Sequence, residues 1–392
     1  MTDLRSAVRA LALGLSLTAV GVFGIAGPDF PAHAVGTEPV GGRQLAARGV
    51  IVNLRPGVPA PPAMPGASFL VANMDTGQIL AAKAPHIRHL PASTLKALTA
   101  LTLIPRLDAN RQIMVRPEDV AVDGTHVPIL PGTAYSVRAL MQGLLMASGN
   151  DAAYALARAN NSIIATLAQM NATAARLGAL DTVARDPSGL DRPGESSSAY
   201  DLALIGRAAM KLPAFRAYVA TKQVRFPGGR SSNGKVVPAF RITNHDKLLF
   251  NYRGAIGIKN GYTIAAKQTF IGAATRAGKT YIVTEMASPN GSWRPTAALL
   301  DWAFAHGTAL SPIGKLVEPR AALSLPPTLA SAGLPPLQAA GSAPLQALPA
   351  LPALPSRPPW IGLVGLAGAV VVVRALRSRS FRSRGVSPKR RR

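Results

Sequence analysis

The 392-residue sequence contains no cysteine and few aromatic residues. The absence of cysteine excludes a disulfide scaffold, a thiol nucleophile, an iron–sulfur cluster and a zinc site built on thiolates. Phe, Trp and Tyr together make up 5% of the chain. Recognition of nucleic-acid bases by stacking on an aromatic platform is therefore not expected.

Acidic residues are also scarce, with 18 Asp and Glu against 43 Lys and Arg, for a net charge of +25. Nine of the cations lie in residues 374–392, which contain no acid. Residues 1–34 carry no net charge, so residues 35–373 carry +16, with the cations scattered singly along the sequence. This distribution argues against a nucleic-acid partner and favours an anionic cell-envelope environment.

The first 34 residues have the pattern of a secretory signal. Arg5 and Arg9 precede an apolar stretch over 10–26, and Ala32-His33-Ala34 supplies a small-x-small cleavage site. We expect residues 1–34 to be a signal peptide, with a mature start near Val35. A retained signal anchor is the alternative.

The C-terminal region predicts a membrane anchor. Residues 360–373 are uninterruptedly apolar, and residues 358–376 as a helix extend about 28 Å, close to the ~30 Å hydrocarbon core. We expect a transmembrane helix over 360–376 and a basic cytoplasmic tail over 377–392, since cations flanking a span stay inside. The chain would then be a single-pass protein of the cell membrane with its catalytic part on the extracytoplasmic side.

Two proline-rich stretches delimit the remaining region. Residues 35–65 predict an extended leader with little to bury, and residues 311–359, with 12 Pro in 49 residues, predict a semi-rigid stalk rich in Pro and Ala. Between them, residues 66–310 are numerous enough for one sizeable core.

The periodicity of residues 66–310 changes twice along the chain. Strand patterns at 68–74 and 78–82 predict a hairpin, helical patterns fill 92–222, and strand patterns return at 255–263, 268–276 and 279–288 before a closing helix at 296–304. This order predicts an α+β fold, with an antiparallel β-sheet covered by helices and a mostly helical lobe.

The segment Ser93-Thr94-Leu95-Lys96 has the pattern S-x-x-K at the start of a predicted helix. The spacing places the lysine one turn from the serine on the same face. A buried lysine near another cation can be neutral and can deprotonate a serine hydroxyl. Ser232–Lys235 has the same pattern in a Gly/Ser loop, and an ordinary helix cap is the alternative role for Ser93.

Two further short patterns follow. Ser148-Gly149-Asn150 is an S-x-N between two predicted helices, although residues 231–233 and 288–290 match too. Lys259-Asn260-Gly261 is a K-x-G inside a predicted strand, where glycine allows close approach of another backbone or a ligand. Helix capping by Asn150 or Asp151 and a simple strand-edge lysine are the alternatives.

The three patterns occur in order, 55 and then 111 residues apart, on a helix start, a loop and a strand. Together they resemble the motif set S-x-x-K, S-[DGY]-N and K-[ST]-G of the penicillin-recognising serine acyl-transferases. Within that superfamily the sequence resembles the D-alanyl-D-alanine carboxypeptidases of the low-molecular-mass penicillin-binding proteins. The resemblance covers about residues 66–310 and includes RHLPASTLKALTAL, LLMASGNDAAYALA, DPSGLDRPGESSSAYDLALI, ITNHDKLL and GIKNGYT.

The resemblance implies a role for each motif residue. Ser93 would be the nucleophile, Lys96 its general base, and Ser148 the proton relay to the departing D-alanine. The substrate would be held by Asn150, Lys259, Asn260, Gly261, Tyr262 and Thr263, and the backbone N–H groups of Ser93 and Tyr262 would form the oxyanion hole.

The implied substrate is a peptidoglycan stem peptide ending in D-Ala-D-Ala, and β-lactams would be covalent inhibitors. No metal or organic cofactor is required. The sequence departs from the family pattern in two places: Asn260 stands where Thr or Ser is usual, and no second β-rich domain follows the catalytic one.

Two other functions remain open from the motifs alone. A class A β-lactamase shares them but deacylates with a Glu through a water. Glu195 is the only Glu between Asn150 and Lys259, and it lacks the Leu-Asn that follows in that family's pattern. A non-catalytic wall-binding or β-lactam-sensing module is the second alternative.

Overall fold

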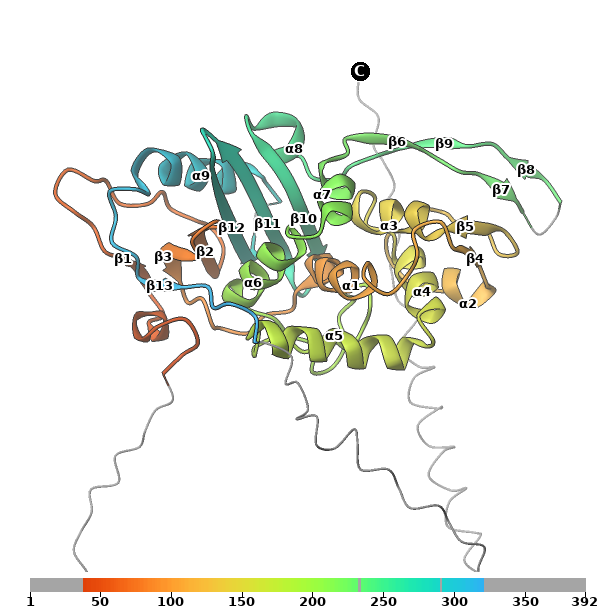
Figure 1. Cartoon of the computed structure of the whole chain (residues 1–392), viewed down its shortest axis with the longest axis horizontal. Coiled ribbons are helices and arrows are strands. Elements are labelled where there is room, and N and C mark those ends of the chain that lie inside the picture. The colour runs from red at the N-terminus through yellow and green to blue at the C-terminus, as the bar shows by residue number, and fades with distance from the viewer. Residues whose placement is uncertain (1–37, 232–233, 290, 321–392) are drawn as a thin grey trace, which may run out of the picture. The chain divides into compact units, whose positions relative to one another are not determined.

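The computed structural model describes residues 38–231, 234–289 and 291–320 (Figure 1). The expected signal peptide, transmembrane helix and basic tail lie outside the described residues, as does most of the expected stalk. Within the described part, no helix is both long enough and apolar enough to cross a membrane.

An antiparallel seven-stranded sheet forms the centre of the fold (Figure 1). Six strands follow the order β1-β3-β2-β12-β11-β10, and β13 pairs with β3 beside β1. The predicted hairpin and the three predicted later strands are confirmed as neighbours in this sheet. The strands are β1 (Val50–Val52), β2 (Ser68–Asn73), β3 (Gln78–Lys83), β10 (Ala255–Thr263), β11 (Lys267–Arg276), β12 (Lys279–Ser288) and β13 (Gly314–Lys315).

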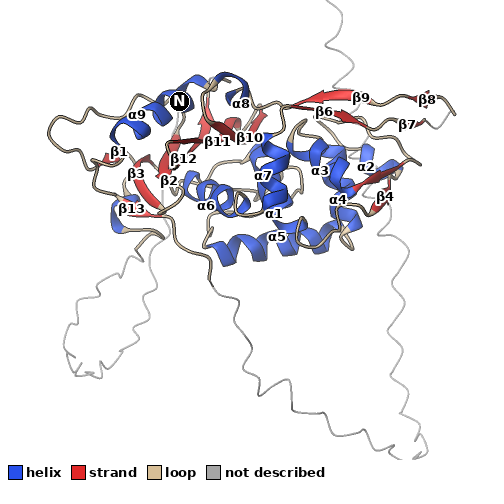
Figure 2. Cartoon of the chain, turned by 45° about the horizontal axis from the view of Figure 1, so that its top comes forward, coloured by secondary structure: helices blue, strands red, loops and turns tan. Residues whose placement is uncertain are grey.

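Helices cover both faces of the sheet and form a lobe beside it (Figure 2). The closing helix α9 packs on one face, and α6 packs on the other. Serine side chains fix several helix starts, as when Ser136 Oγ accepts a hydrogen bond from the Ala139 N–H at 3.2 Å. The helices are α1 (Lys96–Leu103), α2 (Pro117–Val120), α3 (Val137–Leu145), α4 (Asn150–Ala159), α5 (Ile163–Leu177), α6 (Ala199–Ala209), α7 (Pro213–Ala220), α8 (Leu248–Asn251) and α9 (Arg294–His306). The predicted α+β class is confirmed.

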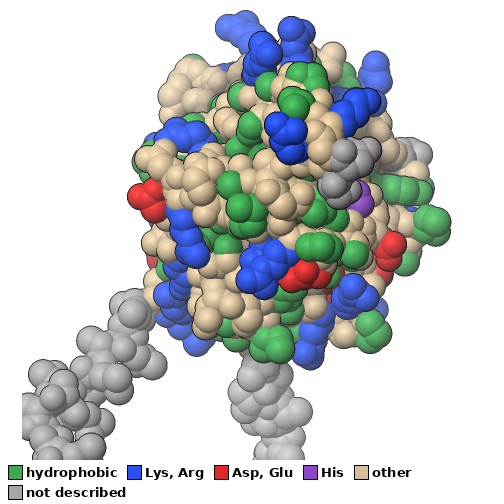
Figure 3. Space-filling view, turned by 90° about the vertical axis from the view of Figure 1, so that its right-hand side faces the viewer, with side chains coloured by type: hydrophobic (Ala, Val, Ile, Leu, Met, Phe, Trp, Pro, Cys, Tyr) green, Lys and Arg blue, Asp and Glu red, His purple; other side chains and the backbone are tan. Residues whose placement is uncertain are grey.

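A long β-ribbon projects from the body above α3, and we call residues 222–243 the arm (Figures 1 and 2). Its base pairs β6 (Gln223–Phe226) with β9 (Phe240–Thr243), and its outer part pairs β7 (Gly229–Arg230) with β8 (Val236–Val237). Figure 3 views the molecule from this end. The sequence did not predict the arm, because its strands are short and interrupted by Pro and Gly.

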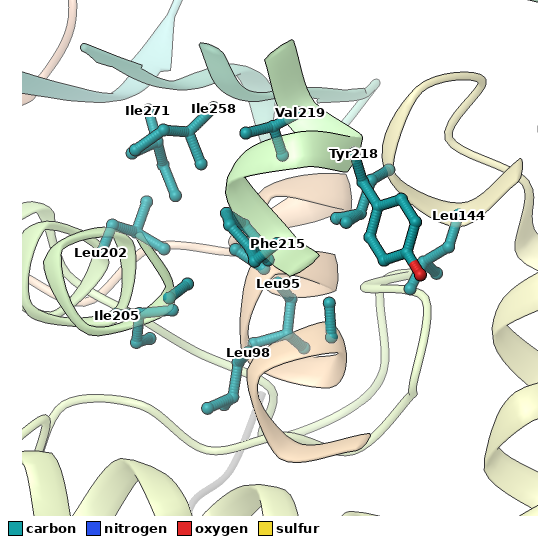
Figure 4. Close-up of a cluster of buried hydrophobic side chains, with 14 of the residues drawn as sticks. Leu95, Leu98, Leu144, Leu202, Ile205, Phe215, Tyr218, Val219, Ile258 and Ile271 are labelled. Carbon is teal, nitrogen blue, oxygen red and sulfur yellow. The ribbon is translucent and has the colours of Figure 1, made fainter. Parts of the chain in front are cut away.

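Sheet and helical lobe share one hydrophobic core (Figure 4). Phe215 of α7 is fully buried between Leu95 and Leu98, directly before and within α1, and the residues Leu202 and Ile205 of α6. Ile258 of β10 and Ile271 of β11 close the cluster from the sheet side. This packing joins the start of α1 to β10, the two elements that carry the first and third motifs.

Within residues 38–65 only Leu45 and Met64 are buried, but the segment is not uniformly extended. A 3-10 turn, η1 (Arg43–Ala46), buries Leu45 to 1% exposure, and β1 pairs with β3. At the other end β13, which belongs to the expected stalk, also pairs with β3. The physical reason is that β3 would otherwise be an open edge with unpaired backbone groups. The sheet therefore extends past residues 66–310 at both ends.

Candidate active site

Ser93 lies in a 3-10 turn, η2 (Ala92–Leu95), directly before α1. The preceding Ala92 has a φ of 48°, in the left-handed region that a residue with a side chain adopts only when its surroundings impose it. The Pro91 carbonyl accepts hydrogen bonds from Thr94 Oγ1 at 2.6 Å and from Thr269 Oγ1 of β11 at 2.7 Å. The turn that presents the serine is thus tied to the sheet.

Lys96 connects the first two motifs. Its side chain is fully buried, and Nζ donates to Ser93 Oγ, Asn150 Oδ1 and the Ser188 carbonyl, each at 2.7 Å. Burial lowers the pKa of Lys96 well below its usual value, and the nearby positive charge of Lys259 lowers it further. An amine in this setting can be neutral and can take a proton from the serine.

The second motif lies in the loop between α3 and α4. Ser148 has a φ of 61° and is 6% exposed, and its hydroxyl makes no hydrogen bond to the described residues. Asn150 Nδ2 donates to the Asp123 carbonyl at 2.6 Å while its Oδ1 accepts from Lys96. Asp151 instead accepts from the Val127 N–H at 3.0 Å. The Asn150 side chain therefore faces the lysine and does not cap a helix.

The third motif lies on β10, the edge strand of the sheet. Lys259 is 1% exposed, and its Nζ donates to the Asn260 carbonyl at 2.7 Å and to Asn260 Oδ1 at 3.5 Å. Burial lowers the pKa of Lys259 to about 7, and the negative charge of Asp246 opposes that shift.

Gly261 brings β10 into contact with the nucleophile turn. A Cβ at this position would lie 2.8 Å from the Ser93 nitrogen and 2.9 Å from the Thr94 nitrogen. Tyr262, the next residue, is 65% exposed. The Thr263 hydroxyl has two partners of its own, because it donates to Asp191 at 2.9 Å and accepts from the Ala266 N–H. Thr263 thus ends β10 and its hydroxyl holds the turn that follows, while no hydrogen bond joins it to Lys259.

The loop of residues 186–195 completes the surroundings of Lys96. Asp186 Oδ1 accepts from the Ser188 N–H at 2.7 Å, which orients the Ser188 carbonyl toward Lys96. A Cβ on Gly189 would lie 2.0 Å from the Ala92 carbonyl oxygen, so this position requires glycine. The sequence motifs did not identify Ser188 as part of the site, because it contacts Lys96 through its backbone carbonyl and any residue type has one. The segment Pro-Ser-Gly at 187–189 indicates a turn there and no more.

Glu195 is unsuited to activate the deacylating water, which is the role that a class A β-lactamase assigns to a glutamate. Its side chain is buried, and Oε2 accepts from the Arg185 N–H at 3.1 Å and from the Asp186 N–H at 2.9 Å. Burial raises the pKa of Glu195 to about 8, so the carboxyl is mostly protonated at neutral pH. A protonated carboxyl cannot activate a water, which argues against the β-lactamase alternative.

The other motif matches lie elsewhere. Ser231 and Lys235 belong to the arm, Ser288 ends β12, and Ser232, Asn233 and Asn290 lie outside the described residues. Across the described ranges, no group of three or more His, Asp or Glu side chains could hold a metal ion.

Comparison with known proteins agrees with this arrangement. The model of the D-alanyl-D-alanine carboxypeptidase family, peptidase S11, matches residues 57–290. D-alanyl-D-alanine carboxypeptidase DacB2 of Mycobacterium tuberculosis is 43% identical over 248 residues, which cover 62% of this chain and 83% of that protein.

Solved structures show the same likeness. The crystal structure of a D-alanyl-D-alanine carboxypeptidase from M. tuberculosis H37Rv matches with a TM-score of 0.62 and 40% identity, over 68% of this chain and 99% of that one. The Streptomyces K15 DD-transpeptidase matches with a TM-score of 0.59 and 30% identity, over 63% of this chain and all of that one. Since the family model spans more than half of the sequence and its relatives share the fold that brings the three motifs together, the chain belongs to the D-alanyl-D-alanine carboxypeptidase family.

Proposed function

We propose that this protein is a serine D-Ala-D-Ala carboxypeptidase that removes the terminal D-alanine of peptidoglycan stem peptides. The observation that carries the proposal is the buried contact between Lys96 Nζ and Ser93 Oγ at 2.7 Å, in a site that lowers the pKa of the lysine. That contact supplies a serine nucleophile with an adjacent base.

Acylation begins when neutral Lys96 takes the hydroxyl proton of Ser93 as Oγ attacks the carbonyl carbon between the two D-alanines. The backbone N–H groups of Ser93 and Tyr262 donate to the oxyanion that develops. The tetrahedral intermediate then collapses, and the C–N bond to the terminal D-alanine breaks. The proton held by Lys96 passes through the Ser148 hydroxyl to the departing amine, which leaves Lys96 neutral again.

Deacylation uses the same base. A water molecule gives a proton to Lys96 and attacks the ester carbonyl of the acyl-enzyme. The ester C–O bond breaks and the proton on Lys96 returns to Ser93 Oγ. The shortened peptide leaves with a new carboxyl group, which releases its remaining proton to solvent. β-Lactams would acylate Ser93 by the same first step, because opening their amide bond replaces cleavage of the peptide bond.

Recognition of the substrate carboxylate falls to β10. Lys259 in its charged form attracts the carboxylate, and the Asn260 amide can donate a hydrogen bond to it. Negative charge close to Lys259 favours its protonated form, so binding of the carboxylate would raise the pKa of Lys259 above about 7. Binding of the substrate carboxylate would thereby increase the protonated fraction of Lys259, the form that binds it.

The test is covalent labelling together with turnover. Fluorescent penicillin should label the protein, and Ser93→Ala should abolish labelling while the protein stays folded. Ser232→Ala, in the duplicate S-x-x-K pattern, is the matched control and should label normally. Labelling that persists in Ser93→Ala would refute the assignment. Labelling without release of D-alanine from a D-Ala-D-Ala peptide would favour the β-lactam-sensing alternative.

For its location, the sequence supports export and anchoring at the cell membrane through residues 360–376. The support is the apolar stretch over 358–376 with nine cations from Arg374 onward, together with the signal pattern in residues 1–34. A chain truncated after Arg320 keeps β13 and should be soluble and active, whereas the full chain should sediment with membranes. Full-length protein that stays in the soluble fraction would contradict the anchor.

A further inference from the structure

The base of the arm carries an unfavourable arrangement of charge. Arg225 on β6 and Arg241 on β9 are directly opposite in the antiparallel register, and both are exposed. Like charges in this relation destabilise a strand pair. Neither arginine has a salt bridge to any described residue. An anionic ligand would turn this repulsion into attraction.

The surrounding sequence adds to the positive field. The arm itself, residues 222–243, contains five Lys and Arg and no acidic residue. In Figure 3, which views the end of the molecule near the arm, Lys and Arg gather on the upper part of the surface and no Asp or Glu appears there. The arm therefore adds positive charge at this end of the molecule, where no acidic side chain is seen to offset it.

The arginine pair is continuous with the substrate strand. Residues two apart on a strand share a face, so Thr243 lies on the same outer face as Arg241. Thr243 also lines a surface pocket of about 620 Å³. The pocket extends to Asn260, the middle residue of the K-x-G motif, and its other lining residues are Asn244, His245, Lys247, Phe250 and Asn251.

The pocket has both apolar and polar lining. Lys247 is exposed and adds a cation, and the half-buried Asn260 amide can donate and accept hydrogen bonds. The Asn244 amide is already engaged within the fold. Lys222, at the start of the arm, lies 5.6 Å from the centre of the Phe250 ring and joins the pocket to the arm. Guanidinium groups bind carboxylates through paired hydrogen bonds, which fits the arginine pair to a carboxylate-bearing peptide.

We propose that the outer face of the arm binds carboxylates of a peptidoglycan strand whose D-Ala-D-Ala end is at Ser93. The arm thereby makes the enzyme prefer polymeric, anionic substrate over short free peptides. This inference rests on the proposed function. An anionic lipid surface is the competing partner, and the path from Arg241 through the pocket to Asn260 favours the substrate polymer.

The experiment compares two substrates at two salt concentrations. The variant Arg225→Gln/Arg241→Gln should lose about five- to tenfold in kcat/KM on polymeric peptidoglycan at low salt and keep its activity on a short D-Ala-D-Ala peptide within about twofold. At 0.5 M salt the loss of kcat/KM on polymeric peptidoglycan should shrink to about twofold, because salt screens exposed charges. Arg43→Gln/Arg48→Gln, at η1 and the opposite edge of the sheet, removes the same charge and should change neither activity.

A second variant separates binding from folding. Arg241→Glu creates an opposite-charge pair with Arg225, so it should keep or raise the melting temperature while it weakens binding. Co-sedimentation with insoluble peptidoglycan is compared between Ser93→Ala and Ser93→Ala/Arg241→Glu, so that neither protein can cleave the polymer. The Arg241→Glu change should lower the bound fraction about fivefold. Peptidoglycan whose carboxylates have been amidated should bind both proteins equally weakly.

Three results would overturn the proposal. The double variant could cleave polymer as fast as the unaltered protein, or it could lose as much activity on the short peptide as on polymer. It could also lose binding to anionic lipid vesicles while it keeps binding to polymer. If the unaltered protein releases no D-alanine from either substrate, the proposed function itself fails. If it releases D-alanine and the double variant does so equally well from polymer, only the role of the arm fails.

Discussion

Replacing Gly261 with alanine should push apart the two elements that form the active site. The new Cβ would lie 2.8 Å from the Ser93 nitrogen and 2.5 Å from Thr269 Oγ1. Unstrained contacts of carbon with heavy atoms lie near ~3.5 Å. Thr269 cannot simply rotate away, because its hydroxyl donates to the Pro91 carbonyl that holds the nucleophile turn. β10 and η2 must therefore separate by roughly 0.7 Å, the difference between ~3.5 Å and the 2.8 Å contact with the Ser93 nitrogen.

The magnitude follows from what β10 carries. Lys259 and the Tyr262 N–H would move with the strand, away from Ser93. A misplacement of about 1 Å can cost about 10²-fold in rate, so a shift of half that size or more should lower kcat/KM by about 10- to 100-fold. Overpacking of this kind also destabilises by about 1–3 kcal/mol, which is a fall of several degrees in Tm.

The assay is the rate of acylation by fluorescent penicillin, with thermal unfolding measured alongside. Gly49→Ala is the matched control, since nothing lies within 4 Å of a Cβ at that position. A folded Gly261→Ala protein that is acylated within about twofold of the normal rate would refute the argument that close contact between β10 and η2 is required.

Three further changes test other parts of the site. Asn260→Ala should slow peptides with a free C-terminal carboxylate by about tenfold and slow amidated peptides less, since a hydrogen bond to a charged group contributes about 1.5–3 kcal/mol; equal slowing would show that Asn260 does not contact the carboxylate. Burial raises the pKa of Glu195 from 4.5 to about 8, so the folded state loses stability as pH rises from about 4.5 toward 8. Glu195→Gln should therefore raise Tm at pH 8.5 and leave it unchanged near pH 4. A pH-independent change would contradict this. Because the pKa of Lys259 is about 7, KM for carboxylate-bearing peptides should rise as pH rises above 7, while KM for amidated peptides stays flat.

The sequence by itself determined the local geometry and the choice of chemistry. A three-residue spacing at a helix start places Lys96 beside Ser93 in any protein that forms that helix, and the structure has the two side chains 2.7 Å apart. Strand periodicity is equally local, so the predicted strand over 255–263 coincides with β10. The order of the three motifs then predicted the family and the fold, as the comparisons confirm.

Only the tertiary structure decided what lies across long distances in sequence. The Ser188 carbonyl reaches Lys96 from 92 residues away, and β1 and β13 cover an edge of β3 that periodicity alone left open. Burial, which raises the pKa of Glu195 and lowers that of Lys259, depends on every segment packed around those groups. Cations that are single in sequence form one face when the arm folds back on itself, because strand pairing places Arg225 opposite Arg241. These long-range contacts, burials and charge pairings cannot be predicted from residue type, because each depends on which segments the fold places side by side.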